Sequence, residues 1–582
     1  IYILKKLKNI YRYYHYNYLM YKIYIPNSNY SEWYFYDENN MLLVEDKNIP
    51  INPLEKKLFN NDVIDSNLNL VFSQIRTDKY IAGILIYTGK TYGRHSNQKL
   101  NYKCVPNDPK VPAFIIPYEE KTTSFEKNKY NKFILFKFKN WSNKHPFGEL
   151  ITVLGNINDL SAYYEYQLYC KNLCISIKEF TNEVNRKMRN KDQKNFINTI
   201  ISNNGNIQKR EDCFIFTIDS KLSTDLDDAI GIKDNILSVY IANVPLLIEF
   251  YELWNSFSER ISTIYLPDRK RPMLPTLLSE NLCSLLENED RFVFCMDIVL
   301  NENKDEILDI TFNNALIKIN KNFRYNDTKE YEENINYKNV FNTCVKLCKK
   351  YKYIKDIKDS HDLIAFLMIL MNFESAKKMI NYSDGIYRTL KMKECDKLNT
   401  KDIPSEVFNF IKIWQSSSGH YTNYENRDTH DMMAPSIEEY LHITSPIRRL
   451  VDLLNMMKLQ TLLGLNKISE DGEKFYQSWI ARLEYINTTM RCIRKIQIDC
   501  NTLSMCINEP NILNTPYEGF IFDKIEWGNQ YLQYTIYIPK IKIITRINTK
   551  LDLPEYSKNY FKLYIIEDGV TLKKKIRAEL YT

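Results

Sequence analysis

The 582-residue sequence has few glycines and lacks the signature motifs of several large enzyme classes. Only 14 glycines are present. A Gly-Lys-Thr triplet at 89–91 does not form a phosphate-binding P-loop, because Gly83 is misplaced by one residue and no helix pattern follows. A Gly-x-Ser-x-Gly elbow and a His-Glu-x-x-His helix are also absent. We therefore exclude a P-loop ATPase and find no basis for a serine hydrolase or a zinc protease.

The twelve cysteines include no Cys-x-x-Cys pair. The closest pairs, Cys170 with Cys174 and Cys344 with Cys348, are separated by three residues, and neither has a second pair at zinc-ribbon spacing. This usage predicts reduced thiols in the core.

Long apolar runs are missing as well. No stretch of about eighteen apolar residues occurs, and lysine and arginine residues interrupt the N-terminal segment 1–30. The sequence therefore predicts neither a membrane span nor a secretory signal. We expect an intracellular, soluble protein without a membrane partner, in the cytoplasm or else in the nucleus.

The net charge of +7 is small for a chain of this length, so a polyanionic partner would need the positive charge to be focused in a channel. Residues 127–144 interleave lysines with aromatic residues, a pattern typical of surfaces that bind single-stranded nucleic acid. The pattern is equally typical of an amphipathic strand, with Phe136 and Phe138 facing the core and Lys137 and Lys139 facing solvent.

Four aspartates fall within the thirteen residues 217–229, where Lys221 is the only basic residue: Asp219, Asp225, Asp227 and Asp228. An acidic stretch is often a solvated loop, but here apolar runs at 214–218 and 236–242 flank it and predict buried strands. Carboxylates held close together resist ionising together unless a cation is present, and Mg²⁺ prefers such hard oxygen ligands. The cluster therefore predicts a cation site, and Mg²⁺ suggests phosphate chemistry.

Two further motifs lie downstream of this cluster. Residues 265–285 contain Tyr-Leu-Pro-Asp-Arg, Pro-Met-Leu-Pro and Leu-Cys-Ser-Leu, and residues 444–452 read Thr-Ser-Pro-Ile-Arg-Arg-Leu-Val-Asp. Together with the acidic segment at 217–229, they resemble the motifs of the RNase II/RNB exoribonucleases, a family that includes RNase R and the catalytic subunit of the eukaryotic exosome. All three motifs occur in the family's order, so the resemblance implies an exoribonuclease of this type.

The resemblance assigns the metal site to Asp219, Asp225, Asp227 and Asp228, which would bind Mg²⁺ directly or through water. In-line attack on a phosphodiester needs an activated water and charge neutralisation at both oxygens, and two metal ions supply both. We therefore expect two Mg²⁺ ions, with Mn²⁺ able to substitute.

Arg448 is the residue expected to hold the scissile phosphate, because a guanidinium binds phosphate through a planar fork and stays charged. Arg449 is expected to assist. Ser445 and Pro446 also predict a helix that begins there, and the N–H groups of its first turn would point at the same phosphate.

Four other residues match positions at which the family contacts RNA. Tyr265 and Tyr325 would stack on the last nucleotides, because an aromatic face accepts any base. Asn372 and Arg388 resemble family positions within shorter motifs. With 44 tyrosines in the chain, only their place in the motifs singles out Tyr265 and Tyr325.

Three positions around these motifs depart from the family pattern. Asn243 replaces an aspartate, and Leu390 and Met456 stand where histidines are usual. None of the three is a proposed metal ligand, so the departures concern residues that would orient the ligands.

The pattern predicts a multidomain α+β protein in which small β-barrels flank a mixed α/β catalytic domain. The expected units are an N-terminal arm with a first cold-shock-like barrel (1–78), a second cold-shock-like barrel (79–185), a polar linker (186–212), an RNB catalytic domain (213–508) and an S1-like barrel of the OB type (509–582). This arrangement resembles the exosome-type enzymes. The sequence leaves no room for a PIN nuclease region ahead of the barrels, so endonuclease activity is not expected.

We therefore expect a monomeric, Mg²⁺-dependent 3′ to 5′ exoribonuclease that hydrolyses single-stranded RNA to nucleoside 5′-monophosphates. The alternative is an RNA-binding protein on a degenerate nuclease scaffold that regulates RNA stability or translation. The alternative predicts eroded metal ligands, whereas all four aspartates and Arg448 are present. The sequence does not identify an exosome-like or other RNA-decay partner.

Overall fold

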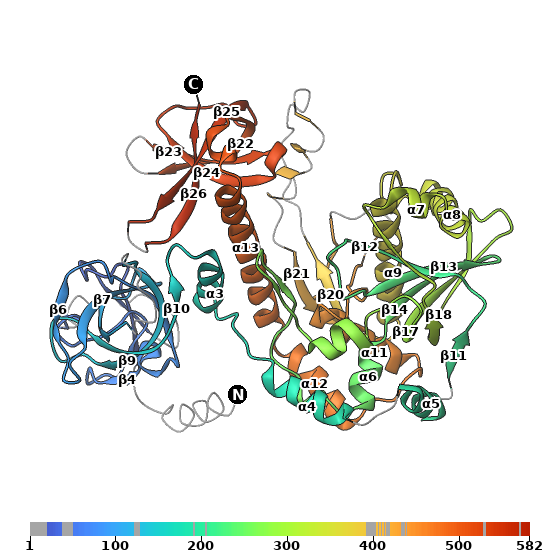
Figure 1. Cartoon of the computed structure of the whole chain (residues 1–582), viewed down its shortest axis with the longest axis horizontal. Coiled ribbons are helices and arrows are strands. Elements are labelled where there is room, and N and C mark those ends of the chain that lie inside the picture. Colours follow the sequence, from blue (N-terminus) through green and yellow to red (C-terminus); the bar gives the residue numbers. More distant parts are fainter. Residues whose placement is uncertain are drawn as a thin grey trace.

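A computed structural model describes most of the chain: residues 20–37, 51–120, 129–189, 193–203, 206–390, 419–431, 439–527, 531–569 and 572–581, with isolated positions between 403 and 414 and at 437. The N-terminal arm expected before residue 20 and the lysine at 127 lie outside these residues. Figure 1 shows β-structure at one side of the molecule and a helix-covered sheet at the other, with the long helix α13 between them.

The N-terminal part contains two sheets. The first has the order β2-β1-β3-β4, and the second has the order β5-β9-β10-β8-β7-β6, with an added β5–β7 pairing that closes it. The strands are β1 Tyr21–Tyr24, β2 Tyr34–Asp37, β3 Val63–Ile64, β4 Leu70–Phe72, β5 Ile81–Leu85, β6 Thr91–Arg94, β7 Leu100–Pro106, β8 Phe114–Tyr118, β9 Lys132–Asn140 and β10 Phe147–Asn156. Helices α2 Gln74–Thr77, α3 Leu160–Cys170 and α4 Lys178–Met188 follow β4 and β10.

The two N-terminal sheets share one hydrophobic core. Phe59, from the segment that precedes β3, is fully buried, and its ring centroid lies 6.0 Å from that of Phe114 and 4.8 Å from that of Trp141. In β9, Phe136 is buried and Lys137 is exposed, as the alternation predicts. The same core contains Ile23 of β1 from the first sheet and Phe114 of β8 from the second, so neither sheet buries its apolar face alone.

The catalytic region is built on a seven-stranded sheet with the order β11-β18-β17-β14-β13-β12-β19. Its strands are β11 Ile207–Arg210, β12 Ile215–Asp219, β13 Asp228–Lys233, β14 Ile236–Ala242, β17 Asp290–Leu300, β18 Ile307–Lys318 and β19 Lys321–Arg324. Two short hairpins join it: β15 Ile264–Tyr265 with β16 Lys270–Arg271, and β20 Ile386–Thr389 with β21 His420–Asn423.

Helices cover both faces of this sheet (Figure 1). In β14, Val239 and Ile241 join the core beneath α8 and α9, whereas Tyr240 and Ala242 join the core beneath α6 and α11. Successive side chains of a strand point to opposite faces, so a sheet covered twice needs nearly continuous apolar strands. The helices are α5 Gln193–Asn203, α6 Val244–Phe250, α7 Thr328–Glu332, α8 Ile335–Tyr351, α9 Ser360–Ile380, α11 Leu450–Leu462, α12 Glu470–Ile480, α13 Leu483–Asn508 and α14 Asn511–Asn514, with short 3₁₀ turns at Trp254–Ser256 and Tyr424–Asn426 and a π-helical turn at Leu277–Leu282.

The stretch 186–212 differs from the expected linker. It contains α5 and β11, and β11 pairs in parallel with β18 at one edge of the seven-stranded sheet. Arg210 is the last residue of β11, and its guanidinium pairs with Asp297 of β17. This salt bridge holds β11 in the sheet. The segment is polar because an edge strand is covered on one side only, and composition alone does not distinguish such a strand from a linker.

The C-terminal part is a five-stranded sheet with the order β24-β23-β22-β25-β26, and β24 also lies against β26, which closes the barrel. Its elements are β22 Tyr517–Trp527, β23 Tyr531–Ile538, a 3₁₀ turn at Pro539–Ile541, β24 Ile543–Thr549, β25 Lys558–Glu567 and β26 Lys574–Leu580. Helix α13 contacts β26 and α3 at one part of its length and β15 and β21 at another. The predicted multidomain α+β class, with β-barrels flanking a mixed centre, is confirmed.

The eleven cysteines in the described part of the chain are all free, which confirms the prediction of reduced thiols for them. In the same residues, no helix combines the length and the apolar character needed to cross a bilayer.

Replacing Phe59 with alanine tests the shared core. We expect Phe59→Ala to lower the free energy of unfolding by about 3–5 kcal/mol, because it removes a buried ring from contacts with both sheets. Urea unfolding followed by near-ultraviolet circular dichroism measures this. The matched control Tyr92→Ala, at a half-exposed position of β6, should change stability by less than about 0.5 kcal/mol. Separate unfolding transitions for the two N-terminal sheets would contradict a common core.

Asp62 makes the stability of this region depend on pH. Its side chain is fully buried, and burial raises its pKa to about 6 although Phe59 N–H donates to Oδ2 at 2.8 Å. The folded state therefore holds a proton that the unfolded chain releases, so stability should rise as pH falls from 7 to 5, by about 1 kcal/mol. Thermal melts of wild type and Asp62→Asn at both values check this. The asparagine variant should lose only the share of about 1 kcal/mol that Asp62 contributes, since other buried acids titrate in the same range, and an equal slope in both proteins would contradict the role of Asp62.

Candidate active site

The four aspartates lie on the turn between β12 and β13 and on the strand ends that flank it. Asp219 is the last residue of β12 and Asp228 the first of β13. Leu226 fixes the turn, because its side chain is buried and its N–H donates to Ser284 Oγ at 3.0 Å. The Asp227 carbonyl accepts from Ala242 N at 2.9 Å. The acidic stretch is thus a built part of the sheet end and not a solvated loop.

Among the described residues, no cationic side chain pairs with Asp219 or Asp228, and the buried atom Asp219 Oδ2 has no hydrogen-bond partner. Both residues are partly buried. Burial raises the pKa of Asp219 to about 6, and burial together with the charges of Asp219 and Asp227 raises the pKa of Asp228 to about 8. Two such acids that oppose each other's ionisation are stabilised in their charged form by a cation.

Asp227 joins the turn to the third sequence motif. Its side chain is only 2 % exposed, Oδ1 accepts from Ile447 N at 2.9 Å, and Oδ2 accepts from Arg448 Nε at 3.1 Å. Burial raises the pKa of Asp227 to about 7, and Arg448 works in the opposite direction. The carboxylate therefore positions the segment that carries Arg448.

Asp225 is held by the second motif. Tyr265 Oη donates to Oδ2 at 2.9 Å, and Lys270 Nζ donates to Oδ1 at 2.9 Å. Lys270 also pairs with Glu280 at 2.7 Å. Burial works to lower the pKa of Lys270, but its bonds to Glu280 and Asp225 outweigh burial and raise that pKa above its ordinary value.

The structure separates the four predicted metal ligands into two pairs. Among the described residues, no group of three or more His, Cys, Asp or Glu side chains is arranged to hold a metal ion. Mg²⁺ commonly keeps several waters and takes only one or two carboxylates from the protein. Asp219 and Asp228, with the orphaned Asp219 Oδ2, supply such a pair, whereas Asp225 and Asp227 are bonded to cationic side chains.

Arg448 is the half-exposed cation of the site. Its Nη2 donates to Ser445 Oγ at 3.0 Å, and 47 % of the side chain is exposed. Burial works to lower the pKa of Arg448, but Asp227 and the neighbouring acids raise it further, so the guanidinium stays charged. Arg449 instead bonds Ser445 Oγ at 3.2 Å and the buried Asp452 at 2.8 Å. Arg449 therefore stabilises the segment 445–452 through its bonds to Ser445 and Asp452.

The helix expected to begin at Ser445 begins five residues later. Residues 446–448 form a turn, Arg449 has extended backbone and pairs with Ser262, and α11 starts at Leu450. The Asp452 carboxylate accepts from Ser445 N at 2.8 Å and thereby satisfies the group that a first helical turn would have left free. The N–H group nearest the acids is that of Ile447, and it is bonded to Asp227.

Tyr265 and Tyr325 flank the aspartates, as their motif positions predict. Tyr265 is 38 % exposed beside Asp225, and Tyr325 N–H donates to the Asp219 carbonyl at 3.0 Å. The ring of His361 stacks on Tyr325 with a centroid distance of 3.7 Å and an interplanar angle of 14°. No spacing in the sequence singles out His361, because it reaches the site only through the packing of α9.

Asn372 and Arg388 both bond Tyr440, ahead of the third motif, and their contacts with RNA stay a prediction. Asn372 is buried in α9, its Nδ2 donates to Tyr440 Oη at 2.8 Å, and its Oδ1 accepts from Ile443 N at 2.9 Å. It therefore positions the segment that leads to the third motif. Arg388 lies over the Tyr421 ring at 5.0 Å, behind Arg449.

The three departures from the family pattern are part of the packing. Met456 is buried in the core beneath α9, and Leu390 is buried beside His430. Asn243 donates to Asn314 Oδ1 at 3.0 Å and accepts from Gln460 Nε2 at 3.0 Å. The replacements are accommodated by apolar contacts and by an amide network.

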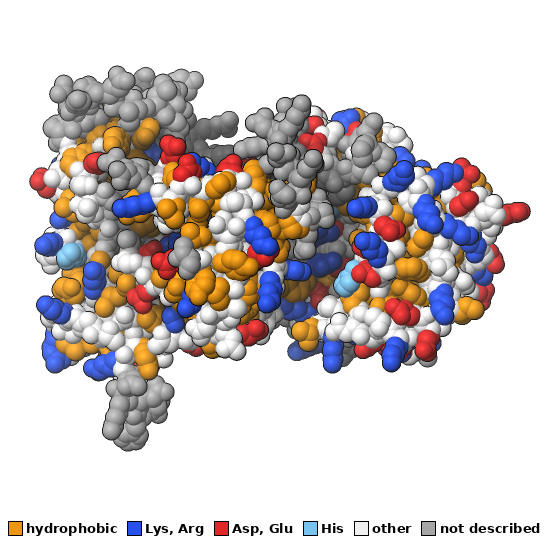
Figure 2. Space-filling view, turned by 90° about the horizontal axis from the view of Figure 1, so that it is seen from above, with side chains coloured by type: hydrophobic (Ala, Val, Ile, Leu, Met, Phe, Trp, Pro, Cys, Tyr) orange, Lys and Arg blue, Asp and Glu red, His pale blue; other side chains and the backbone are white. Residues whose placement is uncertain are grey.

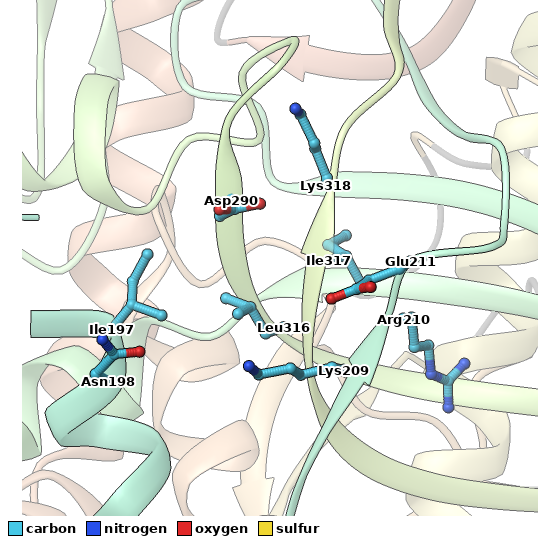
Figure 3. Close-up of a pocket in the computed structure, with 9 residues that line it drawn as sticks. All are labelled: Ile197, Asn198, Lys209, Arg210, Glu211, Asp290, Leu316, Ile317 and Lys318. Carbon is cyan, nitrogen blue, oxygen red and sulfur yellow. The ribbon is translucent and has the colours of Figure 1, made fainter. Parts of the chain in front are cut away.

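A cavity of about 390 Å³ lies elsewhere, between α5, β11 and β18 (Figure 3). Lys209, Glu211, Asp290 and Lys318 line it with mixed charge. Because β11 and β12 are separated by four strands in the sheet order, the cavity is separate from the aspartate cluster.

Comparison with known proteins agrees with this architecture. Residues 208–352, which contain the acidic segment and most of the seven-stranded sheet, match the RNB domain. Residues 101–168 match the Dis3-like cold-shock domain 2 (CSD2), and the predicted resemblance to the RNase II/RNB family in its exosome-type form is confirmed.

One curated relative is the DIS3-like exonuclease 2 of Schizosaccharomyces pombe, which is 30 % identical over 243 residues. That match covers 39 % of this chain and 25 % of the relative, so the chain spans about a quarter of the relative's length. Two solved structures share the fold over nearly the whole chain. Mycoplasma genitalium RNase R in complex with ribose methylated single-stranded RNA has a TM-score of 0.68 at 17 % identity, covering 96 % of this chain and all of that one. Yeast Ssd1, described as a pseudonuclease, has a TM-score of 0.59 at 15 % identity, covering 94 % and 80 %.

Restoring the family aspartate at position 243 tests the amide network. Asn243→Asp should lower the free energy of unfolding by about 2 kcal/mol, because a buried carboxylate cannot donate to Asn314 Oδ1. Differential scanning calorimetry measures the change, and the exposed Asn198→Asp is the matched control. A stabilised Asn243→Asp protein would show that the hydrogen-bond network does not require an amide at position 243.

Proposed function

We propose that this protein is a Mg²⁺-dependent 3′ to 5′ exoribonuclease that hydrolyses single-stranded RNA to nucleoside 5′-monophosphates. One observation supports the proposal: four segments that are distant in sequence bring together two carboxylates without a salt bridge among the described residues, a half-exposed arginine and two tyrosines. These are the groups needed to bind a cation, a phosphate and a base.

Each side chain has a distinct part in the proposed reaction. Asp219 and Asp228 would hold the divalent ion, which when bound supplies charge neutralisation and an activated water. Arg448 presents its free guanidinium edge to the scissile phosphate, because Asp227 and Ser445 occupy the rest of it. Tyr265 offers an exposed ring to the terminal base, and its hydroxyl is anchored on Asp225.

An approach for an RNA strand is suggested by the shape of the surface. Figure 2 shows a hollow between the barrel side and the catalytic side of the molecule, with lysine and arginine side chains visible in and around it. Basic side chains gathered around a hollow attract a polyanion although the net charge is small. Single-stranded RNA is the proposed ligand, in line with the bound RNA named for the Mycoplasma genitalium RNase R structure. We propose that the protein acts as a cytoplasmic monomer.

A second candidate function is RNA binding without hydrolysis. The pseudonuclease description of yeast Ssd1 shows that the same fold serves a protein without nuclease activity. In this chain, the salt bridges of Asp225 and Asp227 leave only two acids for a metal ion. RNA hydrolysis and RNA binding must therefore be measured separately.

The decisive experiment compares 3′-labelled and 5′-labelled single-stranded RNA in the presence of Mg²⁺. Wild type should release the 3′ label as a nucleoside monophosphate before the 5′ label, and chelation of the metal should stop the release. Asp228→Asn should reduce the rate about 10²–10³-fold, because a metal ligand supplies several kcal/mol of transition-state stabilisation. Its affinity for RNA, measured by fluorescence anisotropy, should change less than the rate.

Asp234→Asn is the matched control, because Asp234 is exposed in the turn after β13 and its left-handed backbone suits asparagine. It should keep the wild-type rate. Tight RNA binding by wild type with neither label released would reject the exonuclease and favour the second candidate.

A further inference from the structure

Lys270 lies among the acidic side chains of the site, and the sequence motif that contains it assigns it no role. It lies in β16, directly opposite Tyr265 of β15 in the two-stranded hairpin. Its ammonium group contacts three oxygen atoms: Asp225 Oδ1 at 2.9 Å, Glu280 Oε1 at 2.7 Å and the hydroxyl of Thr224. Two carboxylates and a hydroxyl are also the hard oxygen ligands that a divalent cation would take.

The surroundings of this ammonium group are partly closed to water. The Asp225 side chain is 6 % exposed, and that of Lys270 is 22 % exposed. Both oxygens of Asp225 are in use, since Tyr265 Oη donates to the one that Lys270 leaves free. Each oxygen keeps a second lone pair, so an ion bound to Asp225 would lie beside the Lys270 ammonium and be repelled by it unless Lys270 moved away.

We propose that the Lys270 ammonium takes the place of a second divalent cation, so that the protein binds a single ion, at Asp219 and Asp228. Lys270 is then a positioning residue, which holds Asp225 and through it the Tyr265 hydroxyl. In place of the two expected Mg²⁺ ions, the site would then contain one ion and the fixed positive charge of Lys270. This inference rests on the proposed function in one respect, namely that Asp219 and Asp228 hold the ion.

Removing the ammonium group should reopen the second site. In Lys270→Met the stem of the side chain is kept, but Asp225 and Glu280 are left without a cation. Partly buried carboxylates without a partner are unfavourable, and a divalent ion would restore the balance. Lys270→Arg keeps the positive charge and should behave like wild type.

The test is the number of Mn²⁺ ions bound per chain, measured without RNA by equilibrium dialysis and by electron paramagnetic resonance of free Mn²⁺. Wild type and Lys270→Arg should bind one ion at saturation, and Lys270→Met should bind two. Lys350→Met is the matched control, because Lys350 pairs with Glu306 at 2.8 Å in α8, far from the aspartates in sequence. It should bind one ion.

Two ions in wild type would overturn the inference, and so would one ion in a folded Lys270→Met protein. If Lys270→Met does not fold, the wild-type value alone still decides between one ion and two. RNA hydrolysis is scored independently. Two ions in wild type together with 3′ to 5′ hydrolysis would reject the proposed role of Lys270 and support the exonuclease. One ion in wild type without hydrolysis would support the role of Lys270 and reject the exonuclease. No bound ion would reject both.

Discussion

The arrangement of the site depends on the buried carboxylate of Asp227. It accepts from Ile447 N and Arg448 Nε, two groups more than two hundred positions away along the chain. A carboxylate this deeply buried is stable only with such partners, so the turn after β12 and the segment before α11 must be in place together. Asp227 consequently brings Arg448 to the acids, with Asp452 and Ser445 supporting the same segment, while Tyr265 is held there by Asp225.

The sheet beneath the site explains why this contact holds its geometry. Strands β12, β13 and β14 are buried on both faces, beneath α8 and α9 on one side and α6 and α11 on the other. Side chains held by packing and by neighbouring hydrogen bonds keep their positions far better than those on free loops. The polar groups that extend from the strand ends are therefore held by a dense apolar core.

Much of this could be predicted from the sequence, because motif residues and alternation patterns act locally. The flanking strands, the helix at 360–380, the barrels at both ends and the clustering of the aspartates with Tyr265, Tyr325 and Arg448 all follow from such patterns. Side-chain pairing could not be predicted in the same way. Whether Asp225 faces a metal or Lys270, whether Asn372 is accessible, and whether His361 covers Tyr325 depend on rotamers and helix packing that a linear pattern does not encode. Polar composition likewise concealed the edge strand β11 within the segment 186–212.

Helix α13 sets a length scale for the molecule. Its 26 residues extend for about 39 Å, and it touches the C-terminal barrel strand β26 as well as β15, the strand of Tyr265. The barrel and the tyrosine therefore rest on one common support. A substitution on the face of α13 that packs against β15 can displace Tyr265 although the substituted residue lies outside the acidic cluster, and a shift of the barrel against the helix can reach the site by the same route.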